Sequence, residues 1–324
     1  MIWVTPSDQI RPAAFSANAV LFGLSLVAME VASAFVLYGT AFAAIVQIGG
    51  RSASRGITHL TLIAGFASTL FWPLTGILNE HYDWRAIYLS FAALNLFVCL
   101  PIHYRVALTP RRAEPLFSSE DEHPMVGLPR SGLFLLMLAA FAIAGLVLAS
   151  ILTHMVPLVA ALGLGSAGLA ASTLFGPAQV ASRLLNMVFG GQLSQATLAL
   201  IAAGLLALAL ALLLATGPWL PGVVLFAVLF GLGSGLASIV GGTLPLELFG
   251  RRGYGSRLGW VTAARQFSSA LAPYAFARIM QEWGIGQALA IGVGAALAAT
   301  ALFAAIVVRW AKRRDLVGQP AAGR

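Results

Sequence analysis

The sequence predicts an all-α polytopic membrane protein with about nine transmembrane helices. Of its 324 residues, 59% are hydrophobic and only 9% are charged, and the mean hydropathy is +0.89. A soluble protein of this length could not bury so much apolar surface. In lipid, only helices and closed barrels satisfy their backbone hydrogen bonds, and no alternating pattern typical of barrel strands occurs. Helices are therefore expected throughout the membrane.

The expected spans are apolar runs long enough to cross the hydrocarbon, which takes about 20 helical residues. The first run is too long for one ordinary helix and too short for two, and Glu30 lies in its middle. The nine runs cover residues 16–47, 57–79, 86–104, 132–158, 166–190, 196–216, 221–248, 258–281 and 286–309.

A short polar stretch, N-E-H-Y-D-W-R-A from Asn79 to Ala86, separates the second run from the third. Tyr82 and Trp84 suit the membrane interface, where an aromatic ring is half in water. Arg85 lies close enough in sequence to pair with a neighbouring carboxylate. We interpret the stretch as an extracellular turn and not as an active site.

The basic residues predict the orientation of the chain. With the C-terminus in the cytoplasm, fourteen Arg and Lys side chains fall on the inner side, and only Arg11, Arg85 and Arg278 fall on the outer side. Short cytoplasmic loops carry the excess of Arg and Lys in membrane proteins. We expect a cytoplasmic C-terminus, an outer N-terminus of this chain, and a place in the cell inner membrane.

The longest gap between spans, residues 105–130, is polar, mixed in charge and interrupted by prolines. This composition is typical of a linker between helical bundles. The predicted organisation is a partial N-terminal bundle over 1–104, a cytoplasmic linker over 105–130, a C-terminal six-helix bundle over 131–310 and a cytoplasmic tail over 311–324.

Short matches recur across the linker at a separation of about 202 residues. F-A-S-T-L-F-W-P from Phe66 is similar to F-S-S-A-L-A-P from Phe267, and Ser-Arg and Gly-Thr pairs recur in the same register. Such offsets indicate two parallel halves. The second half has six expected spans and the first has three. We therefore expect three N-terminal spans to be missing and this chain alone to transport poorly.

Three motifs carry a resemblance to a known family. They are L-Y-G-T-A-F-A (Leu37–Ala43) with the basic turn R-S-A-S-R-G after it, D-W-R-A-I-Y (Asp83–Tyr88) and A-Q-V-A-S-R (Ala178–Arg183). With the two parallel halves, they resemble a prokaryotic, N-terminally truncated member of the major facilitator superfamily. The nine spans would match that family's fourth to twelfth helices. The signature G-x-x-x-D-R-x-G-R is absent, and its second-half echo, Gly190–Ser194, is uncharged.

The resemblance implies a secondary active transporter that moves a small solute by alternating access. The fifth and eighth spans resemble family helices that line the central cavity. Each carries a polar face with one arginine, Arg183 or Arg265, about 10 Å from its cytoplasmic end at 1.5 Å per residue. Each arginine could instead snorkel to the cytoplasmic surface. The expected cavity-lining residues are Arg183, Arg265, Gln179, Asn186, Gln266, Ser269, Tyr38 and Trp72.

Two arginines in one cavity favour an anion, because a guanidinium grips carboxylate or phosphate with two parallel donors. The expected solute is therefore a small organic anion such as a monocarboxylate. Glu30 and His59 are candidates for a coupling proton, since burial can shift the pKa of either. For both residues, a place near the end of a span is the alternative interpretation.

Other classes of protein find little support in the sequence. No H-E-x-x-H or G-x-S-x-G motif occurs, and Cys99 is the single cysteine, so neither an enzyme, a metal centre nor a bound cofactor is expected. The glycine-rich stretch Gly231–Gly242 predicts close helix packing and not nucleotide binding. We expect a monomer in the lipid bilayer that binds no nucleic acid. A multidrug or metabolite efflux permease, a channel and a truncated protein that does not transport are the alternatives.

Overall fold

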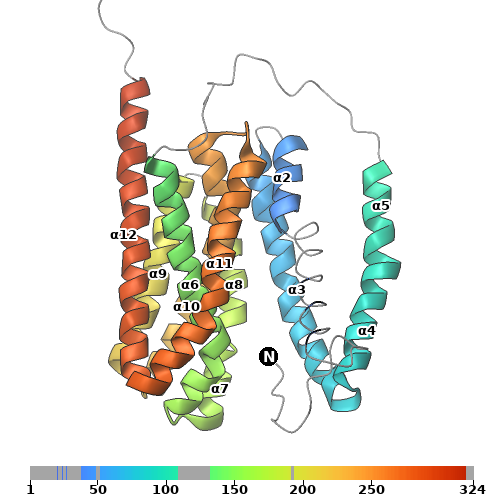
Figure 1. The fold of residues 1–324 in the computed structure, drawn as a ribbon, viewed down its shortest axis with the longest axis vertical. Coiled ribbons are helices and arrows are strands. Elements are labelled where there is room, and N and C mark those ends of the chain that lie inside the picture. Colours follow the sequence, from blue (N-terminus) through green and yellow to red (C-terminus); the bar gives the residue numbers. More distant parts are fainter. Residues whose placement is uncertain are drawn as a thin grey trace, which may run out of the picture. The chain divides into compact units, whose positions relative to one another are not determined.

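The all-α architecture is confirmed in the part of the chain that the structure describes. The computed structural model describes residues 20, 24, 27, 38–48, 52–108, 132–190 and 193–318, and these form helices and short turns without strands (Figure 1). Five described helices are long and apolar enough to cross a membrane. They lie at Arg85–Ile102, Gly132–Ala161, Gln195–Thr216, Leu220–Phe249 and Ile285–Lys312, in agreement with five of the expected spans.

Contacts divide the chain into two compact units. One comprises Met1–Ala41 and Ala67–His123, and the other comprises Phe42–Phe66 and Pro124–Arg324. The bundle ranges predicted from the linker stay a prediction. By packing, however, the stretch 42–66 groups with the second unit, because Phe42 and Ile57 lie against Gly242 and the Thr61 carbonyl accepts a hydrogen bond from Arg183.

Among the described residues after the linker, the second unit contains seven helices. α9 packs on α10 and α12, α6 packs on α11 and α12, and α8 packs on α10. The helices are α6 (Gly132–Ala161), α7 (Gly165–Ser172), α8 (Phe175–Phe189), α9 (Gln195–Thr216), α10 (Leu220–Phe249), α11 (Tyr254–Trp283) and α12 (Ile285–Gly318).

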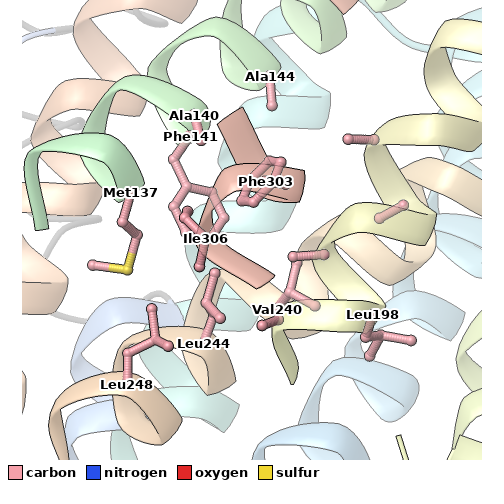
Figure 2. Close-up of a cluster of buried hydrophobic side chains, with 14 of the residues drawn as sticks. Met137, Ala140, Phe141, Ala144, Leu198, Val240, Leu244, Leu248, Phe303 and Ile306 are labelled. Carbon is pink, nitrogen blue, oxygen red and sulfur yellow. The ribbon is translucent and has the colours of Figure 1, made fainter. Parts of the chain in front are cut away.

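Part of the apolar core of this unit joins α6, α9, α10 and α12, and Figure 2 shows its side chains. Phe141 of α6 meets Phe303 of α12 edge to face, with ring centroids 5.4 Å apart. Val240 and Leu244 extend this cluster along α10. Such ring pairs add to the stabilisation that burial alone provides. The cluster therefore gives the second unit a fixed packing on which polar side chains can be positioned.

The helices before the linker are α2 (Tyr38–Ile48), α3 (Ala53–His81), and a continuous run of α4 (Trp84–Leu94), the π-helix η2 (Asn95–Cys99) and α5 (Leu100–Leu108). The π-helical turn ends two residues before Pro101, which has no N–H to offer the helix. Leu100 N–H instead bonds the Asn95 carbonyl, five residues back. The third expected span is thus a helix with a π-bulge.

Two expected spans differ in detail. The run predicted as one helix over 166–190 is two helices, α7 and α8, because the chain tightens at Thr173 and Leu174, whose N–H groups bond carbonyls three residues back. Pro177 follows and cannot donate to the Thr173 carbonyl, so a single regular helix cannot continue. Most of the first run, 16–47, lies outside the described residues, and only its end appears in α2.

The turn predicted at Asn79–Arg85 is observed between α3 and α4. Asp83 precedes α4, and its carbonyl accepts the N–H groups of Ala86 and Ile87. Arg85 Nη1 lies 3.5 Å from Asp83 Oδ2, and the two side chains are 30% and 57% exposed. An ion pair this exposed contributes little to stability. These contacts are those of a turn between two helices, and the absence of an active site here stays a prediction.

The predicted repeat is visible in the helix boundaries. α3 covers Ala53–His81 and α11 covers Tyr254–Trp283, so the two helices begin and end about 202 residues apart. The turn before each of them also matches, since α2 ends at Ile48 and α10 ends at Phe249. The helix boundaries therefore recur at the same separation as the sequence matches.

Candidate functional site

Arg183 lies where three helices of the second unit meet. The side chain is 4% exposed. Arg183 belongs to α8. Its Nε donates to Ser238 Oγ on α10 at 3.1 Å. Its Nη1 donates to the Thr61 carbonyl on α3, also at 3.1 Å. Buried charged groups are costly unless hydrogen-bonded, and these two bonds supply partners. Arg183 thus joins α8 and α10 to the first part of α3.

Glycine allows α3 to approach this guanidinium. Gly65 lies one turn after Thr61, and a Cβ atom at Gly65 would collide with Arg183 Nη1. A second close approach occurs at Gly242 of α10, where a Cβ would lie 2.6 Å from Phe42 Cδ2 and 3.2 Å from Ile57 Cγ2. The stretch 42–66 therefore packs against α8 and α10 at glycines, where the absence of a Cβ atom allows the side chains to come close to the backbone.

The polar face of α8 faces the glycine-rich stretch of α10. Gln179 Nε2 donates to Ser234 Oγ at 2.9 Å. A Cβ atom at Gly231 would lie 2.5 Å from the Phe175 carbonyl oxygen, and one at Gly235 would collide with Ser182 Oγ and the Gln179 carbonyl oxygen. The prediction of close helix packing is confirmed, since the small residues bring the backbones into contact.

The hydroxyls of Ser234 and Ser238 were not among the residues expected from the sequence. Both lie inside the glycine-rich stretch, which the sequence identifies only as a packing surface. Their spacing of four residues places them on one face of α10. Two hydroxyls on the same face as the glycines are the signal that could have identified them as partners for Gln179 and Arg183.

Arg265 lies against α6 and α10. A Cβ atom at Gly145 of α6 would lie 2.5 Å from Arg265 Cγ, and one at Gly241 of α10 would lie 3.5 Å from Arg265 Nη1. Arg265 also borders a small cavity whose other lining residues are apolar, among them Phe141 and Phe303. Within the described residues, no hydrogen bond or ion pair involves this guanidinium.

Both arginines therefore contact α10, Arg183 at Ser238 and Arg265 beside Gly241. Three residues of helix separate these positions, which is about 4.5 Å along the axis. The structure brings the two guanidiniums to a similar level on α10 but in different surroundings. Arg183 is held by hydrogen bonds to neighbouring helices, whereas the Arg265 guanidinium has no hydrogen-bond partner among the residues that the structure describes.

The other polar residues expected to line a cavity on α8 and α11 differ in what they contact. Ser269 Oγ donates to the Gly145 carbonyl at 3.2 Å and so helps join α11 to α6. Asn186 lies beside Gly190, where α8 ends, and a Cβ at that glycine would collide with Asn186 Oδ1. Gln266 is exposed on α11. Their expected place in a solute cavity stays a prediction.

The site residues expected before the linker do not all fall within the second unit. Tyr38 begins α2 and is half-buried, within the first unit. His59 is exposed on α3, in the part of that helix that belongs to the second unit. Glu30 and the side chain of Trp72 lie outside the described residues. Among the described part of the chain, the strongest polar juxtaposition is therefore the one around Arg183.

A polar cavity of about 380 Å³ lies where α3, α9 and α10 begin or end, and Ser54, Gln195 and Glu247 are among its lining residues. Glu247 Oε2 accepts the backbone N–H of Gln195 at the start of α9, and Glu247 Oε1 lies 3.3 Å from Trp310 Nε1. A carboxylate is favourable at a helix N-terminus. Glu247 thus ties α10 to α9 and α12.

The fold and these polar contacts define a polytopic membrane protein whose second unit carries a buried arginine, Arg183, and a half-buried one, Arg265. The family model described as Major Facilitator Superfamily matches residues 10–273, most of the chain, so this protein belongs to the major facilitator superfamily, a transporter family. It is a membrane protein that acts on a small-molecule solute. A search among curated proteins found no match.

Proposed function

We propose that the protein is a secondary active transporter of a small organic anion, such as a monocarboxylate, and that Arg265 is its principal anion contact. The main support is the Arg265 guanidinium, which lies between α6 and α10 without a hydrogen bond or ion pair in the described part of the chain. A charge taken out of water without a partner is costly. An anionic solute supplies the missing partner.

The chemistry of arginine suits this role. The guanidinium is planar, stays charged and offers donors in a rigid fork that matches the two oxygens of a carboxylate. Gly145 and Gly241 leave room beside its stem and its Nη1. Arg183 of α8 also contacts α10, but its Nε already donates to Ser238 and its Nη1 to the Thr61 carbonyl.

Arg265→Gln is expected to weaken carboxylate binding about ten- to two-hundred-fold, because a charge-assisted hydrogen bond contributes roughly 1.5–3 kcal/mol. Arg265→Lys keeps the charge without the fork and should recover part of this loss. The measurement is the thermal stabilisation of the purified chain by acetate, lactate and pyruvate, with acetamide and lactamide as neutral counterparts.

Arg278→Gln is the matched control, since Arg278 is 61% exposed and pairs with Glu282 on the surface. This variant should be stabilised by each carboxylate over the same range of concentrations as the wild type. Equal stabilisation by a carboxylate in the wild type and in Arg265→Gln would contradict the assignment. Stabilisation by the amides but not by the acids would instead favour a neutral solute.

The proposal also covers orientation and coupling. The C-terminus is placed in the cytoplasm of a cell with an inner membrane, the chain acts as a monomer, and Glu30 or His59 carries a coupling proton. In a Cys99→Ser background, Asn79→Cys should react with an impermeant maleimide added to intact cells, whereas Ser118→Cys should react only after the cells are opened. Labelling of Ser118→Cys in intact cells would reverse the orientation.

A further inference from the structure

We propose that Arg183 is a latch that holds the first part of α3 against α8 and α10 in one of the conformations of the transporter, and that the latch opens when access to the solute changes sides. The inference rests on the proposed transport function. It assigns Arg183 to the conformational change and leaves anion contact to Arg265.

The position of the latch within α3 supports this role. α3 is one continuous helix from Ala53 to His81. Its residues up to Phe66 belong to the second compact unit, and those from Ala67 belong to the first. The Arg183 contacts fall at Thr61 and Gly65, at the end of the part that packs with the second unit. A movement between the units must therefore either bend α3 near this point or release these contacts.

The chemistry of the contact makes it reversible. Arg183 Nη1 bonds a backbone carbonyl, which is also the kind of acceptor that a helix uses internally, so Thr61 keeps a partner when the arginine leaves. Arg183 keeps its Nε bond to Ser238 on α10. The hydrogen bond from Arg183 Nη1 to Thr61 is thus exchanged for one with water, while the Nε bond to Ser238 keeps the side chain on α10.

The neighbouring contacts of α3 are also suited to separation. Phe42 and Ile57 pack against Gly242, and Ser54 borders the polar cavity with Gln195 and Thr243. Apolar contact with a glycine has no directional bond to break. A polar cavity of about 380 Å³ already lies beside Ser54, near the start of α3. The hydrogen bond from Arg183 Nη1 to the Thr61 carbonyl is, by contrast, a directional contact between this part of α3 and α8.

The latch is tested by cysteine reactivity at Thr58, without any solute. Thr58 is 8% exposed and lies three residues before Thr61. In a Cys99→Ser background of the full chain in membranes, Thr58→Cys should react slowly with a permeant maleimide. Arg183→Gln should raise the rate about tenfold, and Gly65→Ala should do the same, because its Cβ displaces the guanidinium. Combining the two changes should add little, since both remove one contact.

Controls separate the latch from general loosening. Gly39→Ala, where a Cβ has open space, and the surface change Arg278→Gln should leave the rate at Thr58 unchanged. A second reporter, Ser150→Cys, lies 4% exposed on α6 and should stay slow in every variant. Arg183→Lys should give an intermediate rate at Thr58, because one ammonium cannot reproduce both donor directions.

Three results would overturn the latch: an unchanged rate at Thr58 in Arg183→Gln, an equal rise at Thr58 and Ser150, or additive effects of Arg183→Gln and Gly65→Ala. The assay uses no solute, so it is independent of the anion assignment. Loss of carboxylate binding in Arg265→Gln with no change at Thr58, or the reverse, shows which of the two proposals fails.

Discussion

Gly235→Val is expected to lower the stability of the protein by about 3 kcal/mol or more. A side chain at this position meets Ser182 Oγ and the carbonyl oxygen of Gln179. A backbone oxygen cannot rotate away, so α8 and α10 must separate along their shared face. Overpacking of this kind costs roughly 1–3 kcal/mol and more where the backbone must move. The Gln179–Ser234 and Arg183–Ser238 bonds would be strained as well.

The matched control is Gly204→Val on α9, because a Cβ atom at Gly204 has nothing within 4 Å. Both changes put the same β-branched residue into a helix interior, so the difference between them isolates packing. The measurement is the apparent Tm of the purified protein in detergent. The two proteins should differ by several degrees, at roughly 2–4 °C per kcal/mol. Equal Tm values would show that the stability of the protein does not depend on the close packing of α8 against α10.

Glu247→Ala is expected to lower stability by roughly 2–4 kcal/mol. Its carboxylate accepts the Gln195 N–H at the start of α9 and the Trp310 indole N–H of α12. Each donor left without an acceptor costs about 1–3 kcal/mol. The favourable charge at the α9 N-terminus, about 0.3–1 kcal/mol, is also lost. Water from the adjoining cavity offsets part of this loss.

Glu247→Gln should have a smaller effect than Glu247→Ala, because the amide keeps one acceptor oxygen. Glu282→Ala is the matched control, since Glu282 is 46% exposed and pairs with Arg278 on the surface. It should lower the apparent Tm by no more than about 4 °C, in line with roughly 0–1 kcal/mol for such pairs. If Glu282→Ala lowered the apparent Tm as much as Glu247→Ala, the contacts of Glu247 would contribute no more to stability than an exposed ion pair does.

Hydropathy predicted the helices well where apolar residues dominate, and α6, α9, α10 and α12 lie close to the expected spans. The sequence did not predict the break at Thr173, because hydropathy is insensitive to the hydrogen bond that Pro177 removes. Arg85 with Asp83 was predictable, since neighbours in a short turn are forced together. Long-range pairs depend on how separate helices pack, which local sequence does not determine.

The surroundings of the two arginines could not be predicted from the sequence. Both occupy polar stripes at similar depth, and a helical wheel gives them the same description. Their difference comes from partners on other helices, namely the Thr61 carbonyl and the hydroxyl of Ser238 for Arg183. A backbone carbonyl exists at every residue and carries no sequence signal. Gly65, which makes room for the guanidinium, and Ser238, on the glycine face of α10, are the sequence signals of these contacts.

The grouping of residues 42–66 with the second unit has a consequence for building chimaeras from related chains. A crossover in the linker would combine α3 of one parent with α8 and α10 of another. The donor of the first half must then supply glycine at the position of Gly65, and any larger residue would meet Arg183 of the recipient. The compatible crossover follows residue 66, inside α3, so that the segment 42–66 and its partners come from the same parent.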